Sequence, residues 1–183
     1  EGDHRYLSNR EEREEGGTQE VLGTIRAGLT VQAHRAVGPE TVQALERSLV
    51  EKLYAGLAAM PNVVVLGPEL AGGGGEGRTP VASFLVRAPE GARHAFLHYN
   101  FVCSLLSDLF GVQSRGGCAC AGPYGLRLLG VAEADAHALE ALLVDQVEAL
   151  RPGFTRVSLP YCFSAFELDY VLRAVQAVAE AGR

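Results

Sequence analysis

The chain places two cysteines, Cys118 and Cys120, in a glycine-rich segment that begins with the cation Arg115 and ends at Pro123. The thiolate is the nucleophilic form of cysteine, and a neighbouring arginine on exposed backbone favours that form. A cysteine packed into a core is inert by comparison. The segment therefore predicts a reactive pair of thiols rather than a structural one.

Two further residues could bind anions. Arg156 lies in the alternating segment 155–159, and a guanidinium on a strand can hold a carboxylate through two parallel hydrogen bonds. The plain alternative for Arg156 is a surface ion pair, which stabilises little. Thr18 follows Gly17 and precedes a helical pattern, so the two residues offer a hydroxyl and free N–H groups to a phosphate. The plain alternative for Thr18 is an ordinary helix cap.

Other reactive side chains have simpler interpretations. A Cys-x-Cys pair supplies too few ligands for zinc unless Cys103 and Cys162 converge on it, so we predict no metal site. Cys103 is interpreted as a small core residue and His98 as a histidine at the edge of the core. The only lysine, Lys52, lies beside an apolar helical stripe, where its ammonium group stays in water.

Composition excludes several classes of protein. The 183 residues carry a formal net charge of −6, and no basic cluster is interleaved with aromatic residues, so nucleic acid is not an expected partner. No apolar run approaches the roughly 20 residues of a membrane helix, so no membrane span is expected. Cysteines separated by one residue do not resemble the disulfide framework of a secreted module. We therefore expect a cytoplasmic protein.

The elements that must position these residues follow from periodicity. Apolar residues at helical spacing predict helices over residues 19–37, 39–60, 96–110 and 133–150, and a capping box of Ser164 with Glu167 predicts a last helix. Short apolar or alternating runs predict strands at 63–66, 81–86 and 155–159. Leu45, Phe101 and Leu109 are expected to face the core. This order favours an α+β fold with helices packed on a small, mainly antiparallel sheet.

Three separated segments together resemble one family. Residues 13–18 fit the pattern R-x-E-x-G-T, residues 115–123 fit R-x-G-x-x-C-A-x-P, and residues 156–159 fit R-x-S-L just before a capped helix. Together they resemble the class V aminotransferase superfamily of fold type I pyridoxal-phosphate enzymes, most closely its cysteine desulfurase and selenocysteine lyase branch. The likeness runs from Arg13 to the C-terminus, apart from an additional helix between Tyr124 and Thr155.

The resemblance implies a role for each candidate residue. It makes Cys120 the thiol that takes sulfur from a cofactor-bound amino acid as a persulfide, and Arg156 the group that holds the carboxylate of this small substrate. Arg115 would assist the thiolate or an anionic substrate. Cys118 would be a resolving thiol, a second acceptor or incidental. Gly17 and Thr18 would reach the phosphate of pyridoxal phosphate in a neighbouring subunit, which implies a homodimer.

The resemblance also implies how the chain divides. Residues 1–37 would be the end of the cofactor domain with a connecting helix, and residues 38–183 would be the C-terminal small domain. The lysine that forms the Schiff base with the cofactor would lie in an N-terminal cofactor domain outside this sequence, so the chain alone should be inactive. Two alternatives stay open: a class V transaminase or lyase without persulfide chemistry, and a non-catalytic interaction module with the small-domain fold.

Overall fold

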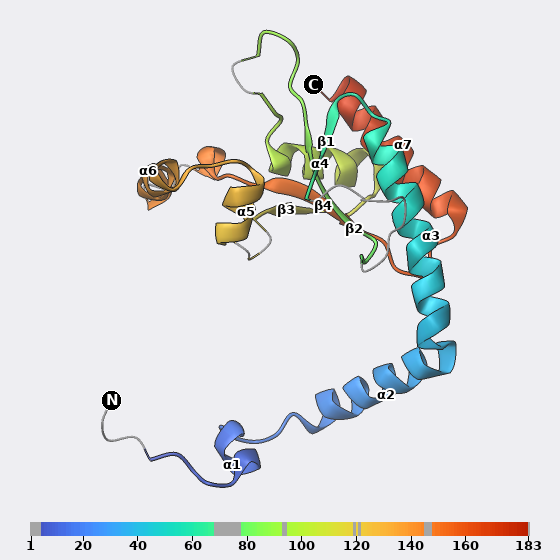
Figure 1. Cartoon of the computed structure of the whole chain (residues 1–183), viewed down its shortest axis with the longest axis vertical. Coiled ribbons are helices and arrows are strands. Elements are labelled where there is room, and N and C mark those ends of the chain that lie inside the picture. The colour runs from blue at the N-terminus through green and yellow to red at the C-terminus, as the bar shows by residue number, and fades with distance from the viewer. Residues whose placement is uncertain are drawn as a thin grey trace. The chain divides into compact units, whose positions relative to one another are not determined.

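The computed structural model describes residues 5–67, 78–92, 95–118, 120, 122–144 and 148–182, and these residues form an α+β fold (Figure 1). Contacts divide the chain into two units, Glu1–Val42 and Gln43–Arg183, and each is described by itself. The run of glycines at residues 72–75, whose composition is typical of a surface loop, lies outside the described residues, and so does Val147 of the helix predicted over residues 133–150.

The first unit consists of helices with little buried surface. It contains α1 (Arg10–Glu14), α2 (Val21–Val37) and the first residues of α3 (Pro39–Ala58). The predicted start of α2 near residue 19 is two residues early, because Glu20 is the N-cap and its carboxylate accepts a hydrogen bond of 2.7 Å from the Gly23 N–H. Gly38, with φ of 93°, ends α2, and Pro39 begins α3 as predicted.

The second unit is built on a four-stranded sheet. Its order is β1 (Val63–Leu66), β2 (Val81–Val86), β4 (Phe154–Ser158) and β3 (Arg115–Gly117), and all three pairings are antiparallel. The predicted antiparallel sheet is confirmed, and the first three residues of the cysteine segment form β3, an additional edge strand. Since β3 is only three residues long and two of them are glycines, its sequence carries no strand signal.

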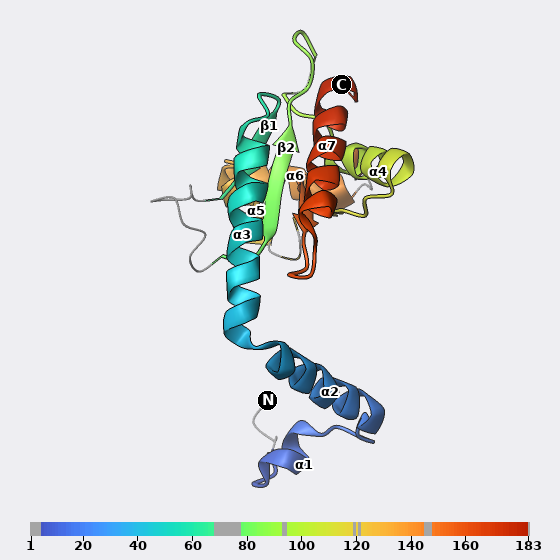
Figure 2. The ribbon, with the colours of Figure 1, turned by 90° about the vertical axis from the view of Figure 1, so that its right-hand side faces the viewer.

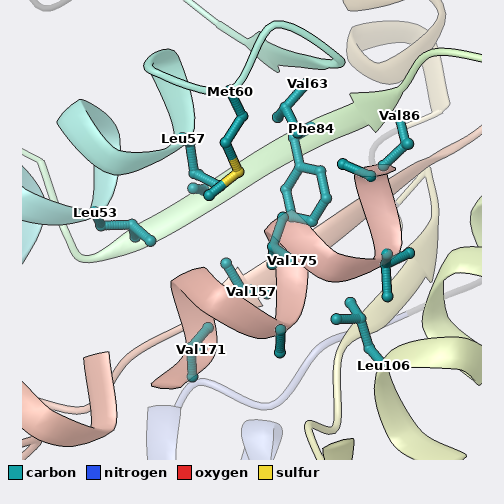
Figure 3. Packing of buried hydrophobic residues seen from close by; sticks show 14 of the residues in the cluster. Leu53, Leu57, Met60, Val63, Phe84, Val86, Leu106, Val157, Val171 and Val175 are labelled. Carbon is teal, nitrogen blue, oxygen red and sulfur yellow. The ribbon is translucent and has the colours of Figure 1, made fainter. Parts of the chain in front are cut away.

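Three helices cover one face of this sheet, namely α3, α4 (Tyr99–Phe110) and α7 (Ala165–Ala181) (Figures 1 and 2). Phe84 and Val157 on the sheet meet Leu53 and Leu57 of α3 and Val175 of α7 in one apolar core (Figure 3). The two helices α3 and α7 approach closely, because a Cβ on Gly56 would lie only 2.6 Å from Cδ1 of Leu172. This core fixes the sheet that carries the candidate site.

Three residues expected in the core are exposed instead. Leu45, Phe101 and Leu109 are 44%, 48% and 67% exposed. Leu45 lies near the start of α3, ahead of the residues that pack on the sheet. Phe101 points away from the packed stripe of α4, and Leu109 lies in its last turn. The spacing of apolar residues therefore predicted the helices but overestimated the width of their buried faces.

Several helices also differ from the sequence prediction, either in their bounds or in their number. The predicted helix 133–150 is shorter, with α6 at Glu133–Val144 and a separate 3-10 turn at Glu148–Leu150. A further helix, α5, spans Gly122–Leu128, where glycine and proline concealed any helical pattern. The predicted helix 96–110 begins at Tyr99, because the His98 Nδ1 atom accepts a hydrogen bond from the Asn100 N–H and caps it.

The last helix begins as predicted. The Ser164 hydroxyl accepts a hydrogen bond from the Glu167 N–H, and the Glu167 carboxylate accepts one from the Ser164 N–H, so the capping box is confirmed. The backbone N–H and the hydroxyl of Ser164 both donate hydrogen bonds to the Glu167 carboxylate, and they hold the pKa of Glu167 below its usual range because they favour the charged form. In the part of the chain that the structure describes, no helix is long and apolar enough to cross a membrane.

Candidate functional site

The two faces of the sheet differ in what covers them. Side chains alternate along a strand, and directly paired residues of antiparallel strands share a face. The helix-covered face carries Ala82, Phe84 and Val157, all buried. On the opposite face of the described sheet only Phe154 is buried; the rest are half-buried or exposed, namely Val64, Leu66, Val81, Ser83, Leu85, Arg115, Arg156 and Ser158.

Two arginines lie side by side on this open face. Arg115 of β3 and Arg156 of β4 are direct cross-strand partners, and Ser83 of β2 is the partner of Arg156 on its other side. Like charges placed opposite each other destabilise a sheet. The Nε atom of Arg156 is also buried without a hydrogen-bond partner. An anion bound at the two guanidinium groups would offset their repulsion and accept a hydrogen bond from the Arg156 Nε–H. This part of the sheet therefore fits a carboxylate.

Cys120 lies next to one of these two arginines, Arg115. The Arg115 Nη2 atom donates a hydrogen bond of 3.0 Å to its Sγ atom, and such a charged donor stabilises a thiolate. Cys120 is exposed, and with φ of 61° it is the only non-glycine residue in the described part of the chain with a positive φ. Left-handed backbone is uncommon outside glycine and is concentrated at functional sites. The geometry suits an accessible nucleophile.

Cys118 has a different environment from Cys120. It is half-buried, and its thiol donates a hydrogen bond of 3.0 Å to the carbonyl oxygen of Pro152. Burial raises the pKa of the Cys118 thiol, and the positive charge of Arg151 offsets part of this effect. The structure therefore favours a protonated thiol at Cys118 and an accessible sulfur beside a cation at Cys120.

The two thiols line a common cavity of about 700 Å³. Arg115 belongs to its wall, so the structure brings together three of the residues predicted from the cysteine segment. The wall also includes Asn100 of α4, His137 of α6 and Arg151, which sequence reasoning did not single out. No short-range pattern could have found these residues, because they come from separate elements.

An aromatic ring supports the floor of this site. A Cβ placed on Gly116 or Gly153 would lie 2.6 Å or 2.5 Å from atoms of the Tyr99 ring. Both positions therefore require glycine, so that β3 and the residue before β4 can close around the ring. This packing links the start of α4 to the strands that carry Arg115 and Arg156.

Gly17 and Thr18 belong to the first unit of the chain. Both are exposed, and Thr18 does not cap α2, since Glu20 holds that position. The prediction that Thr18 stands at the helix N-terminus is therefore wrong by two residues. A Cβ on Gly17 would meet nothing within 4 Å, so the backbone forms no enclosed cradle there.

The remaining reactive side chains are dispersed. Lys52 and Cys162 are exposed, whereas Cys103 is half-buried with its Sγ atom 4.0 Å from the Thr155 hydroxyl oxygen. His98 stacks on Tyr99 and caps α4. Among the described residues, no group of three or more His, Cys, Asp or Glu side chains could hold a metal ion.

Comparisons with known proteins add no assignment. No protein family matches the chain, and no curated protein matches it either. The site must therefore be interpreted from its own geometry.

Proposed function

We propose that this chain is the C-terminal portion of a pyridoxal-phosphate enzyme of the class V aminotransferase type, with cysteine desulfurase-like activity. The observation that carries the proposal is that Arg115 both pairs with Arg156 on the open sheet face and donates a hydrogen bond to the exposed sulfur of Cys120. Together they combine a carboxylate grip with a nucleophile, which are the two groups that sulfur removal from a small amino acid requires of this part of the enzyme.

Each residue has a distinct role in this proposal. Arg156 holds the substrate carboxylate, with Ser83 beside it on the neighbouring strand. The Sγ atom of Cys120 forms a bond to the substrate sulfur as the carbon–sulfur bond breaks, and the Arg115 guanidinium holds Sγ in place through its hydrogen bond. Pyridoxal phosphate, when bound, supplies the electron sink for this bond cleavage.

The proposal also requires partners. Helix α2 buries none of its side chains and exposes a set of large apolar residues, namely Val21, Leu22, Ile25, Leu29, Val31 and Val37. An exposed apolar surface of this kind is typical of an interface. We assign it to the N-terminal cofactor domain or to the second subunit of a homodimer. In that dimer, Gly17 and Thr18 would supply an outer contact to the phosphate.

The test uses the full-length enzyme that contains this chain. Cys120→Ala should abolish sulfide release from cysteine while leaving the cofactor bound, because Cys120 accepts the sulfur. The matched control is Cys162→Ala, which removes an exposed thiol outside the cavity and should leave release unchanged. Sulfide release that persists in the Cys120 variant would remove this residue from the mechanism.

Two alternatives give different results in the same preparation. A class V transaminase or lyase without persulfide chemistry would keep its activity in Cys120→Ala and lose it in Arg156→Gln. A non-catalytic interaction module would show neither activity. The chain alone should also form no stoichiometric borohydride-stable adduct with pyridoxal phosphate, because its only lysine, Lys52, is exposed on α3 and does not line the cavity.

A further inference from the structure

The cavity beside Cys120 contains a second guanidinium group, that of Arg151, which does not belong to the arginine pair on the sheet. Arg115 and the side chain of His137 also line the cavity. None of the described lining residues carries a carboxylate. Although the whole chain has a net charge of −6, this cavity therefore presents cations to whatever approaches the thiol.

The shape of the cavity fits a small molecule. Its volume of about 700 Å³ lies within the range of ordinary ligand sites. Leu126 of α5 and Leu139 and Leu143 of α6 give it an apolar wall, and the cations and thiols occupy the remainder. Helix α6 lies in the region that the family resemblance does not cover, so the resemblance does not imply this cavity.

We infer that the cavity binds a small anionic thiol, which takes the sulfur from Cys120. The inference rests on the proposed function for the origin of that sulfur. Arg151 and Arg115 attract the anionic group of the acceptor, the leucines contact its carbon skeleton, and its sulfur lies against Cys120. A concave site of this volume, which the thiols, arginines and leucines line together, matches a small acceptor molecule in size.

The transfer step balances without an added oxidant. The thiolate of the acceptor attacks the outer sulfur of the Cys120 persulfide and forms a new sulfur–sulfur bond. The bond between that outer sulfur and Sγ breaks, and Cys120 leaves as a thiolate that Arg115 stabilises. The products are a persulfide of the acceptor and a regenerated Cys120.

The test measures charge selectivity at Cys120 in the chain alone, without cofactor. Sulfonatoethyl methanethiosulfonate is anionic and trimethylammonioethyl methanethiosulfonate is cationic, and both transfer a thioalkyl group to a thiolate as methanesulfinate leaves. The modification rate of each cysteine is followed by peptide mass spectrometry. Cys162, which is exposed outside the cavity, is the internal reference. The ratio of anionic to cationic rates should be about tenfold higher at Cys120 than at Cys162.

Variants connect this preference to the cavity. Arg151→Gln should reduce the preference at Cys120 several-fold, whereas Arg151→Lys should preserve it because the charge remains. Arg127→Gln is the matched control, since Arg127 is an exposed cation of α5 that does not line the cavity. Equal ratios at Cys120 and Cys162, or a preference that survives Arg151→Gln, would overturn the inference.

A second measurement separates this inference from the proposed function. In the full-length enzyme, mercaptoacetate should support faster sulfur release than cysteamine, and Arg151→Gln should raise the KM for mercaptoacetate alone. A cysteamine rate that equals or exceeds the mercaptoacetate rate would contradict the acceptor site. If no thiol releases sulfur while the charge preference at Cys120 is present, the proposed desulfurase activity fails, and the acceptor role fails with it; the anion site itself stands.

Discussion

Arg115 and Arg156 face each other across the β3–β4 pairing, on the face of the sheet that the helices leave open. Two cations in this position repel each other, and the Arg156 Nε atom lacks a hydrogen-bond partner as well. The arrangement is unfavourable for the fold of the chain by itself. It is favourable for holding an anion, which would account for its presence.

The destabilisation that results from placing Arg115 opposite Arg156 can be measured. Arg156→Met keeps a long side chain but removes the repulsion and the unpartnered N–H, so the free energy of unfolding of the chain should rise by about 0.5–1 kcal/mol in urea titration. In the full-length enzyme the same change should lower kcat/KM for the amino acid by roughly 30-fold, the equivalent of about 2 kcal/mol of lost charged hydrogen bonds.

The control for this variant is Arg173→Met on α7, where an exposed arginine forms an ion pair with Asp169. That change should give no gain in stability, because it removes an attraction rather than a repulsion. A loss of stability in Arg156→Met would show that Arg156 supports the fold, and would count against the anion site.

The two thiols of the cysteine segment should react differently with iodoacetamide. The thiolate is the reactive form, and burial raises the pKa of Cys118, so at neutral pH Cys118 should be alkylated more slowly than Cys120. The alkylation rate of Cys118 should rise with pH as any thiol's does, but the rise should occur at a more alkaline pH than it does for an ordinary thiol. Peptide mass spectrometry over a pH series measures both rates, with the exposed Cys162 as reference. Equal rates at Cys118 and Cys162 at neutral pH would contradict the assigned environments.

Gly153→Ala should disturb the support of the site. The added Cβ would lie 2.5 Å from Cε1 of Tyr99 and 2.7 Å from Cα of Gly117, and the backbone contact cannot be relieved by a side-chain rotation. We expect a loss of about 1–3 kcal/mol in the free energy of unfolding. Gly122→Ala is the control, because nothing lies within 4 Å of its added Cβ. Equal stability of the two variants would refute the packing around Tyr99.

The capping box of α7 gives a prediction on pH. Ser164→Ala should lower the urea midpoint at neutral pH because it removes the hydroxyl, which accepts a hydrogen bond from the Glu167 N–H and donates one to the Glu167 carboxylate. The backbone N–H of Ser164, which remains in the variant, and this hydroxyl both depress the pKa of Glu167 in the folded chain. The hydroxyl's part of that stabilisation is present above the unfolded pKa and is lost as the pH falls through the folded pKa. The difference between variant and parent should therefore shrink in acid. A constant difference would argue against the carboxylate as a partner.

Local patterns predicted the parts of the fold that rest on local physics. The capping box, the proline at the start of α3 and the strands β1 and β2 all follow from neighbouring residues, and the structure confirms them. The same patterns did not predict which apolar side chains stay exposed. Phe101 has a core-like sequence context, but α4 packs through another face.

The candidate site was predictable only in part, for a similar reason. Arg115, Cys118 and Cys120 are close in sequence, and they do line one cavity. The pairing of Arg115 with Arg156 depends on the register of two strands that are distant in sequence. Arg151 and His137 reach the cavity through the packing of separate elements, and the cap of α2 falls on Glu20 rather than Thr18 because a carboxylate reaches the Gly23 N–H.

Sulfur transfer to Cys120 is tested most directly by the mass of the Cys120 peptide after the full-length enzyme has reacted with cysteine in the absence of any thiol acceptor. We expect one additional sulfur atom on Cys120, removed by a reducing agent and absent when Arg156 is replaced by glutamine. An unmodified Cys120 in an enzyme that nevertheless releases sulfide, or the additional sulfur on another cysteine, would show that Cys120 is not the sulfur acceptor.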